Sequence, residues 1–332
     1  MDLMMPNDSM FLFIESREHP MHVGGLSLFE PPQGAGPEFV REFTERLVAN
    51  DEFQPMFRKH PAMIGGGIAR VAWAYDDDID IDYHVRRSAL PSPGRVRDLL
   101  ELTSRLHTSL LDRHRPLWEL HVVEGLNDGR FAMYTKMHHA LIDGVSAMKL
   151  AQRTLSADPD DAEVRAIWNL PPRPRTRPPS DGSSLLDALF KMAGARRCAA
   201  QSWSLDRIKS VKQAAGVTVN DAVLAMCAGA LRYYLIERNA LPDRPLIAMV
   251  PVSLRSKEDA EVDPLYYGTA RLDGSYPLSN IPDGQALNIT LVNNAGNLDF
   301  GLVGCRRSVP HLQRLLAHLE SSLKDLEQAV GI

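Results

Sequence analysis

The sequence has little cysteine, and this shortage already argues against some classes of protein. Three cysteines occur in 332 residues, at Cys198, Cys227 and Cys305. An odd number at wide spacing argues against a disulfide framework and against a zinc site built from cysteine pairs. We therefore expect each thiol to be a small buried group in a protein of a reducing compartment, the cytoplasm.

An excess of basic charge is also missing, as are long apolar runs. The 37 basic residues are outnumbered by 42 acidic ones, which leaves a net charge of -5 and no electrostatic basis for binding nucleic acid. No apolar run reaches the roughly 18 residues that span a bilayer, and the N-terminus has no basic start followed by an apolar core. We expect no transmembrane helix and no signal peptide, so any contact with a membrane or a lipid inclusion would be peripheral.

The composition that is present suits two folded domains. Hydrophobic residues make up 44% and charged residues 24% of the chain, values typical of globular proteins, and 332 residues exceed what one hydrophobic core usually organises. We predict a first lobe over residues 1–160, a proline-rich basic linker over 161–195 and a second lobe over 196–332. Helical and strand-like patterns alternate along the chain, which predicts α/β lobes, each a mixed sheet with flanking helices.

Periodic apolar residues locate several elements of these lobes. The elements predicted in the first lobe are strands over 21–29 and 118–124 and helices over 37–49 and 96–111. In the second lobe a hairpin is predicted to pair 287–292 with 298–303 across 293–297, where Asn and Gly suit positive φ. A last helix with leucines at helical spacing is predicted to begin near Pro310, because proline is tolerated in a first turn.

The stretch from Met137 to Gly144 carries the residues best suited to catalysis. Residues 130–137 are mostly β-branched, aromatic or apolar and follow a turn, so they predict a strand that ends at His138 and His139. Successive side chains of a strand point to opposite faces, so one histidine should act on substrate while the other supports it. An imidazole titrates near pH ~6.5 and can take a proton from an alcohol. We predict His139 as the general base and His138 as its support.

Asp143 and Gly144 follow at the turn into a helix predicted over 145–155. The carboxylate could orient an imidazole, position an arginine or cap the helix, and the glycine could permit a sharp bend and a close approach of substrate. A metal site and a purely structural role are the alternatives, since histidine and carboxylate are common ligands and this pattern alone is weak. No third histidine or cysteine lies at a familiar short spacing. We therefore predict catalysis without a metal ion.

Blocks of sequence in both halves of the chain accompany this motif. They lie at 20–24, 82–86, 115–119, 218–225, 250–255 and 286–290. Together with the motif they resemble the bacterial wax ester synthase/acyl-CoA:diacylglycerol acyltransferase family, a branch of the CoA-dependent acyltransferases related to chloramphenicol acetyltransferase. The resemblance covers nearly the whole chain. It implies two chloramphenicol acetyltransferase-like lobes around a substrate tunnel, with His139 at their interface.

The resemblance also implies a reaction and roles for single residues. An acyl group would pass from acyl-CoA to a fatty alcohol or a diacylglycerol, without a cofactor. His139 would be the general base, Asp143 would be structural, and Asn220 would help to hold the reacting centre. Trp118 and Glu15 occupy positions that the family places near the substrate cavity. From the residues alone, Asn220 is also suited to cap the following helix, and Trp118 to be a core aromatic.

The chain departs from the family pattern at two places. Between 260 and 263 the family carries a long helical stretch and a strand ending in a Ser-Asn-Val-Pro-Gly-Pro-like segment, which this sequence lacks. Near 193–197 the basic linker runs straight into the start of the second half. We interpret these two places, near 195 and near 262, as sites where internal segments are missing.

Two other functions compete with this prediction. Condensation domains of peptide synthetases carry a similar motif and take the acyl donor from a carrier protein, but the block at 116–119 and the N-terminal block favour the lipid family. The second competitor is a non-catalytic lipid-binding protein, although the predicted active-site residues are intact. Transfer from free acyl-CoA would argue against the first. Lipid that copurifies without any consumption of thioester would favour the second.

Overall fold

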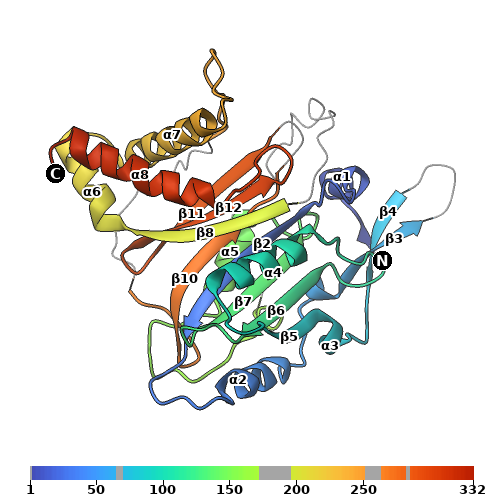
Figure 1. The fold of residues 1–332 in the computed structure, drawn as a ribbon. Coiled ribbons are helices and arrows are strands. Elements are labelled where there is room, and N and C mark those ends of the chain that lie inside the picture. The colour runs from blue at the N-terminus through green and yellow to red at the C-terminus, as the bar shows by residue number, and fades with distance from the viewer. Residues whose placement is uncertain (1, 65–69, 172–195, 251–262, 282–284) are drawn as a thin grey trace.

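The strands form three sheets in the computed structural model, which describes residues 2–64, 70–171, 196–250, 263–281 and 285–332 (Figure 1). A six-stranded sheet lies in the first lobe, a three-stranded sheet lies in the second lobe, and a second three-stranded sheet lies near the N-terminus. The chain therefore has the α/β class that alternating patterns in the sequence predict.

The elements of the first lobe follow the predicted order. They are β1 (Asp2–Leu3), α1 (Pro6–Ile14), β2 (His22–Glu30), α2 (Phe39–Val48), η1 (Pro55–Arg58), β3 (Lys59–Ile64), β4 (Arg70–Tyr75), α3 (Ile81–His84), β5 (Val85–Ala89), α4 (Val96–Thr108), β6 (Trp118–Glu124), β7 (Phe131–His138) and α5 (Gly144–Gln152). The predicted strands and helices of this lobe are confirmed as β2, β6, β7, α2, α4 and α5. Their ends differ from the prediction by a few residues, as frayed helix ends usually do.

The six-stranded sheet combines both halves of the chain. Its order is β5-β6-β7-β2-β10-β9, in which β9 (Tyr266–Tyr267) and β10 (Ala270–Leu278) come from the second half. β5 and β6 are parallel and the other pairs are antiparallel, so the sheet is mixed as predicted. The predicted division of the chain at 160 and 195 therefore does not coincide with a division between sheets.

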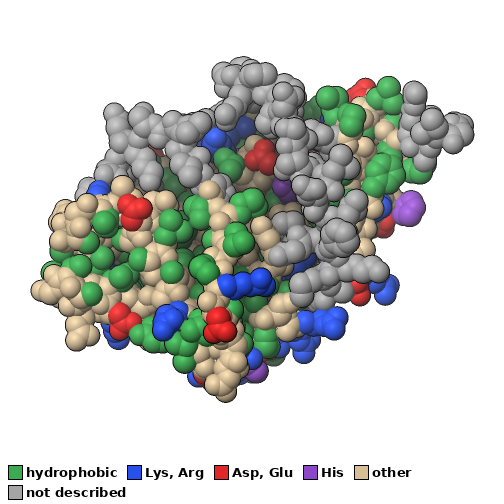
Figure 2. Space-filling model, turned by 90° about the horizontal axis from the view of Figure 1, so that it is seen from above, with side chains coloured by type: hydrophobic (Ala, Val, Ile, Leu, Met, Phe, Trp, Pro, Cys, Tyr) green, Lys and Arg blue, Asp and Glu red, His purple; other side chains and the backbone are tan. Residues whose placement is uncertain are grey.

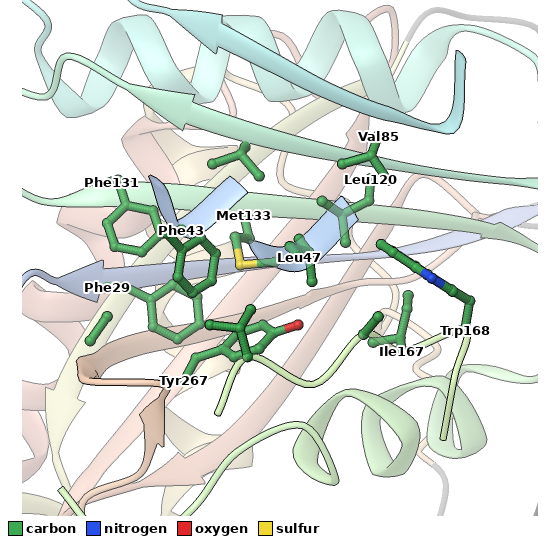
Figure 3. Packing of buried hydrophobic residues seen from close by; sticks show 14 of the residues in the cluster. Phe29, Phe43, Leu47, Val85, Leu120, Phe131, Met133, Ile167, Trp168 and Tyr267 are labelled. Atoms are coloured by element: carbon green, nitrogen blue, oxygen red, sulfur yellow. The ribbon is translucent and has the colours of Figure 1, made fainter. Parts of the chain in front are cut away.

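The two faces of this sheet pack against different layers. Along β7, Phe131 and Met133 join a cluster with α2 and η1, whereas Ala132 and Tyr134 join a cluster that includes α4, β8 and β12. This alternation is the period-two pattern of a strand buried on both faces. Figure 3 shows the first cluster, in which Phe43 and Leu47 of α2 lie among the aromatic side chains of the sheet. Both faces of β7 are therefore packed in a core up to the point where the strand reaches His138.

The second lobe is a smaller sheet covered by helices. Its elements are β8 (Arg196–Ser204), α6 (Leu205–Ala215), α7 (Val219–Glu237), β11 (Leu287–Asn294), β12 (Asn297–Cys305) and α8 (Arg314–Ala329). The sheet order is β11-β12-β8, and both pairs are antiparallel. Figure 1 shows α6, α7 and α8 gathered on one side of this sheet, and apolar side chains from all three join those of the strands in one core cluster.

Two details of the second lobe differ from the sequence prediction. The hairpin is confirmed, but its strands continue to Asn294 and Asn297, and the two turn residues are Ala295 (φ 44°) and Gly296 (φ 82°). Because Asn294 pairs with Asn297, the positive φ angles fall on Ala295 and Gly296. The prediction was right for the glycine and wrong for an asparagine. The last helix begins at Arg314 and not near Pro310, because His311 has φ 59° and interrupts the helical backbone.

The predicted linker is partly structural. Val164, Ile167 and Trp168 are buried in the first cluster, and Trp168 donates a hydrogen bond from its indole N–H to the carbonyl of Asn50 at 2.8 Å. Its ring also stacks on Trp118. The beginning of the segment therefore belongs to the core of the first lobe. The proline-rich part from residue 172 lies outside the described residues.

The small N-terminal sheet and α1 cover the end of the motif. The sheet has the order β1-β4-β3, and Met4 and Trp73 pack with Leu12 of α1 against Ala140. Within the described residues no single helix is long and apolar enough to cross a membrane, and α6 and α7 reach the required length only as a pair bent by 103°.

Candidate active site

His138 ends β7 and is fully buried. Its Nδ1 accepts a hydrogen bond from the backbone N–H of Ala140 at 3.0 Å, so this nitrogen carries no proton. The ring proton is then on Nε2, which lies 3.3 Å from Oε1 of Glu15. The ring is enclosed between the strand and a buried carboxylate, and this position suits support better than contact with substrate.

His139 lies in the turn that follows and is half-buried. Its backbone N–H donates to the carbonyl of Met21 at 2.8 Å, and its ring stacks on Phe11 with 4.3 Å between centroids and 26° between planes. The carbonyl of its own residue lies near the ring and acts on it as an acceptor. Among the described residues the ring makes no hydrogen bond to another residue, so we expect Nε2 to be the nitrogen that accepts a proton. The two histidines thus have the different surroundings that strand alternation predicts.

Burial is the main influence on the acidity of His139. It lowers the pKa of the imidazole below its ordinary value, while the bond to its own carbonyl and the nearby Asp143 act in the opposite direction. The ring is therefore mostly neutral at pH 7. A neutral imidazole with an accessible lone pair can accept a proton from a hydroxyl group, which is what a general base requires.

Asp143 caps α5. In the part of the chain that the structure describes, it makes no bond to an arginine. Its Oδ1 accepts the backbone N–H of Ser146 at 2.9 Å, and its Oδ2 accepts the hydroxyl of Ser146 at 2.8 Å. Burial alone would raise the pKa of Asp143, but these bonds and the nearby His139 hold it below the ordinary value. The carboxylate thus fixes the start of the helix that follows the base, which is one of the three roles predicted for it.

Gly144 is the first residue of α5 and needs no special backbone conformation. Its φ is not positive, and a Cβ placed there would lie 3.8 Å from Cγ1 of Val23, an ordinary contact. The bend that glycine could permit is therefore not one that needs glycine here. A close approach of substrate stays a prediction, and it is the remaining reason for glycine at this position.

For Trp118 and for Asn220 the sequence left two roles open, and the structure bears on each of them. Trp118 is fully buried, donates its indole N–H to the carbonyl of Phe57 at 2.8 Å and stacks on His84 at 4.4 Å. These contacts give it the role of a core aromatic, and its predicted contact with substrate has no support among them. Asn220 is exposed in the first turn of α7, whose N-cap is Thr218. The alternative that Asn220 caps this helix was therefore wrong, and its part in the reacting centre stays a prediction.

Glu15 lies at the end of α1, and its side chain is only 1% exposed. Besides His138, its partners are the backbone N–H of Met21 and the guanidinium of Arg113. These contacts give Glu15 a structural role, and the substrate contact predicted for it stays a prediction. Sequence reasoning missed Phe11, Met21 and Arg113; the four-residue spacing of Phe11 and Glu15 on α1 was the one available signal, because it places both on the same helix face.

Neither a metal site nor a tunnel is defined by the described side chains. No group of three His, Cys, Asp or Glu side chains among them is placed to hold a metal ion. A cavity of about 400 Å³ lies between the lobes, lined among others by Leu28, Leu99, Ala200 and Tyr276. No residue of the motif lines this cavity. The substrate tunnel that the resemblance implies therefore stays a prediction.

Two models of one protein family match most of the chain. Residues 4–195 and 189–223 match the model of the wax ester synthase/diacylglycerol acyltransferase catalytic domain, and residues 260–327 match the model of the C-terminal domain of the same family. The chain belongs to this family. The resemblance inferred from the motif and its accompanying blocks is thereby confirmed.

Relatives within the wax ester synthase/diacylglycerol acyltransferase family cover the chain from end to end. A protein named probable diacylglycerol O-acyltransferase from Mycobacterium tuberculosis is 73% identical, with 100% of both chains covered. The protein named O-acyltransferase WSD from Acinetobacter baylyi is 31% identical over 98% of this chain and 97% of its own length. At these levels of identity the family assignment does not depend on the motif alone.

Solved structures agree with the predicted fold class. The wax ester synthase/diacylglycerol acyltransferase from Marinobacter aquaeolei VT8 superposes with a TM-score of 0.87 at 37% identity, covering 99% of this chain and 100% of that one. The first condensation domain of the CDA synthetase superposes with a TM-score of 0.60 at 13% identity, so it shares the fold alone. Both belong to folds of two chloramphenicol acetyltransferase-like lobes, as the sequence predicts.

The family match is divided near one of the two places where the sequence departs from the family pattern, and it runs across the other. The catalytic domain matches in two stretches that overlap at 189–195. The alignment with the Mycobacterium tuberculosis relative runs over 454 positions, whereas this chain has 332 residues, so that relative carries stretches without a counterpart here. The two places near 195 and near 262 lie outside the described residues. The missing segments therefore stay a prediction.

Proposed function

We propose that this chain is an O-acyltransferase that moves a long-chain acyl group from acyl-CoA to the hydroxyl of a fatty alcohol or of a diacylglycerol. The observation that carries the proposal is the half-buried imidazole of His139, which stacks on Phe11 and, within the described part of the chain, makes no hydrogen bond to another residue. The names of relatives cover both acceptor classes and support the proposal. One relative is named a probable diacylglycerol O-acyltransferase, and a similar solved structure is named a wax ester synthase/diacylglycerol acyltransferase.

In the proposed reaction, Nε2 of His139 is the proton acceptor. Nε2 takes the proton of the acceptor hydroxyl while the hydroxyl oxygen bonds to the thioester carbon, which gives a tetrahedral oxyanion. The carbon–sulfur bond then breaks, the ester leaves, and the imidazolium returns its proton to the CoA thiolate. The sequence of steps needs neither a covalent acyl-enzyme nor a metal ion. We propose Asn220 as a donor to the oxyanion on the strength of the family resemblance.

The test is release of CoA thiol from palmitoyl-CoA, measured side by side with hexadecanol and with a diacylglycerol as acceptor. We expect acceptor-dependent release with at least one of the two. Release from neither, with activity only on a carrier-bound acyl group, would favour a condensation-type transferase. Copurifying lipid without any thiol release would favour a lipid-binding protein and contradict the proposal.

The pH dependence of turnover should report the protonation of His139. The base must be neutral to accept a proton, so kcat/KM is expected to fall as the pH drops through the pKa of His139 and to be level at neutral pH. Because burial lowers this pKa, the midpoint should lie below the ordinary value of ~6.5. Initial rates between pH ~5 and ~8, with circular dichroism at each pH as the stability control, measure it. A midpoint above ~7 would contradict the assignment.

We propose that the chain meets its lipid substrates by peripheral contact with a membrane or lipid-inclusion surface on the cytoplasmic side. Large apolar side chains are exposed on β1 and α1, among them Leu3 (65%), Met5 (61%) and Phe13 (61%). Figure 2 shows hydrophobic side chains at the end of the molecule that α1 and the β3–β4 hairpin form. Exposed apolar surface of this kind supports contact with lipid, and α1 also carries Phe11 against His139. The three unpaired thiols support a reducing compartment.

Replacing Phe13 and Met5 by serine should weaken binding to lipid. We expect the Met5→Ser/Phe13→Ser variant to sediment several-fold less with phosphatidylcholine vesicles that contain diacylglycerol, because apolar area no longer enters the interface. Ile236→Ser on α7, exposed by 46% in the other lobe, is the matched control and should bind as the unchanged protein does. Equal sedimentation of all three proteins would show that α1 is not the contact surface.

A further inference from the structure

We propose that Glu15 is a positioning residue that holds the turn bearing His139 from both of its ends. The inference rests on the proposed function, because it takes His139 as the base. Three groups of contacts carry it: the anchoring of the carboxylate, its link to the backbone before His139, and its link to the backbone after His139. None of these contacts follows from the motif itself, since Glu15 lies more than 120 residues earlier in the chain.

Arg113 anchors the carboxylate. Its Nε and Nη2 donate to Oε2 of Glu15 at 3.3 and 3.0 Å, and Nη2 also donates to the carbonyl of Leu12 at 2.7 Å. The guanidinium thereby ties the carboxylate to the helix that bears it. Oε1 is left for other donors. A two-pronged contact of this kind fixes the orientation of the carboxylate as well as its charge.

The first link runs through Met21. The backbone N–H of Met21 donates to Oε1 of Glu15 at 3.0 Å, and the carbonyl of the same residue accepts the backbone N–H of His139 at 2.8 Å. One residue therefore connects the carboxylate to the backbone of the base. Movement of Met21 would move the amide of His139 with it.

The second link runs through His138. Oε1 of Glu15 lies 3.3 Å from Nε2 of His138, and Nδ1 of the same ring accepts the N–H of Ala140 at 3.0 Å. Nε2 is buried and has no partner with hydrogen-bond geometry among the described residues, so its contact with the carboxylate is one of charge and distance, while Nδ1 bonds to the residue that follows the base. His139 is thus held on its N-terminal side through Met21 and on its C-terminal side through Ala140, with one carboxylate oxygen at the origin of both links.

The same helix also contacts the ring of the base. Phe11 lies four residues before Glu15 and stacks on His139 at 4.3 Å. Burial alone would raise the pKa of Glu15, but the nearby His138 and bonds from Met21 and Arg113 lower it below its ordinary value. The carboxylate is therefore ionised at neutral pH, as an acceptor of several donors must be.

The test is Glu15→Gln, which keeps the shape of the side chain but turns one acceptor oxygen into a donor. Either Arg113 or the pair of Met21 and His138 then faces an amide N–H₂ group. We expect kcat in the thiol-release assay to fall about 10- to 100-fold, the scale of a misplaced catalytic group, with KM for palmitoyl-CoA and for the acceptor within about twofold. Unchanged kcat, or a raised KM with unchanged kcat, would overturn the proposal; the second result would indicate substrate contact.

Glu119→Gln is the matched control. Glu119 is another buried carboxylate of the first lobe, paired with Lys136 at 3.1 Å and His121 at 3.2 Å, and it makes no bond to the turn at 139–141. We expect it to lower the midpoint of thermal unfolding without lowering kcat of the folded protein. An equal fall of kcat in both variants would show a general loss of structure and contradict a specific role for Glu15.

Two further results keep this proposal separate from the proposed function. Absence of thiol release by the unchanged protein would refute the function itself, whereas an active protein with an active Glu15→Gln variant would refute only the positioning role. If Glu15→Gln does not fold, Arg113→Lys replaces it, since the Arg113 side chain is 41% exposed. It should lower kcat several-fold at constant KM, and an unchanged kcat would overturn the proposal.

Discussion

Replacing His139 by alanine is expected to lower turnover with palmitoyl-CoA by about 10²- to 10⁴-fold, the contribution of a positioned general base. The variant loses the imidazole that we propose as the proton acceptor, and His138 cannot replace it because its ring is enclosed and bonded to Ala140. Folding should be kept, since His139 is half-buried in a turn and its backbone bond to Met21 does not need the side chain. Thiol release and thermal unfolding, measured on the same preparation, test both statements.

His318→Ala is the matched control for this result. His318 is also half-buried, but it lies on α8 in the second lobe, where its Nε2 is 3.0 Å from Glu237. Its loss should leave turnover near that of the unchanged protein. Near-normal turnover in a folded His139→Ala variant would remove the general base from the mechanism, and the proposed function would then need another proton acceptor.

The neighbourhood of His139 is predictable from the sequence only along the strand. Residues 130–137 have the composition of a strand, and alternation alone separates His138 from His139. That part is local, and β7 confirms it by sending Ala132 and Tyr134 to one face and Phe131 and Met133 to the other. Alternation predicted different environments for the two rings, but β7 ends at His138, and His139 takes its environment from the turn that follows.

The partners of the two histidines were not predictable in this way. Phe11 and Glu15 reach them from α1 and its C-terminal end, more than 120 residues earlier in the chain, through contacts set by how α1 docks on the end of the motif. Periodicity gives the faces of a helix but not the element that it will meet. The same limit explains why β10 was not assigned to the first sheet, since its pairing with β2 joins residues about 250 positions apart.

Local patterns also misplace residues where a turn or a core position has competing solutions. An alanine takes the positive φ at 295 because the register that pairs Asn294 with Asn297 is fixed by the apolar residues of both strands. For Trp118 the sequence left a core role and a place near the substrate cavity open; its packing partners are Phe57, His84 and Trp168, and contact with substrate stays a prediction. Resemblance to a family locates a residue in the sequence, but the side chains that it contacts are known only from the structure.

Trp118→Ala should therefore act on stability before it acts on substrate binding. Removing a fully buried indole that stacks on two rings and donates to the carbonyl of Phe57 is expected to cost about 3 to 5 kcal/mol of the free energy of unfolding. A large drop in the midpoint of thermal unfolding follows. At a temperature where the variant is folded, KM for palmitoyl-CoA should stay within about twofold of the unchanged value, because the side chain has no exposed surface to offer a substrate.

Trp203→Ala separates loss of stability from loss of a substrate contact. Trp203 is also buried, stacks edge-to-face on Phe300 and donates its indole N–H to Glu320 at 2.9 Å, but it lies in the second lobe. Both variants should unfold at lower temperature with similar KM. If Trp118→Ala alone raised KM while its stability stayed within about 1 kcal/mol of the unchanged protein, the ring would have to be reachable by substrate, and the packing around β6 would have to open during turnover.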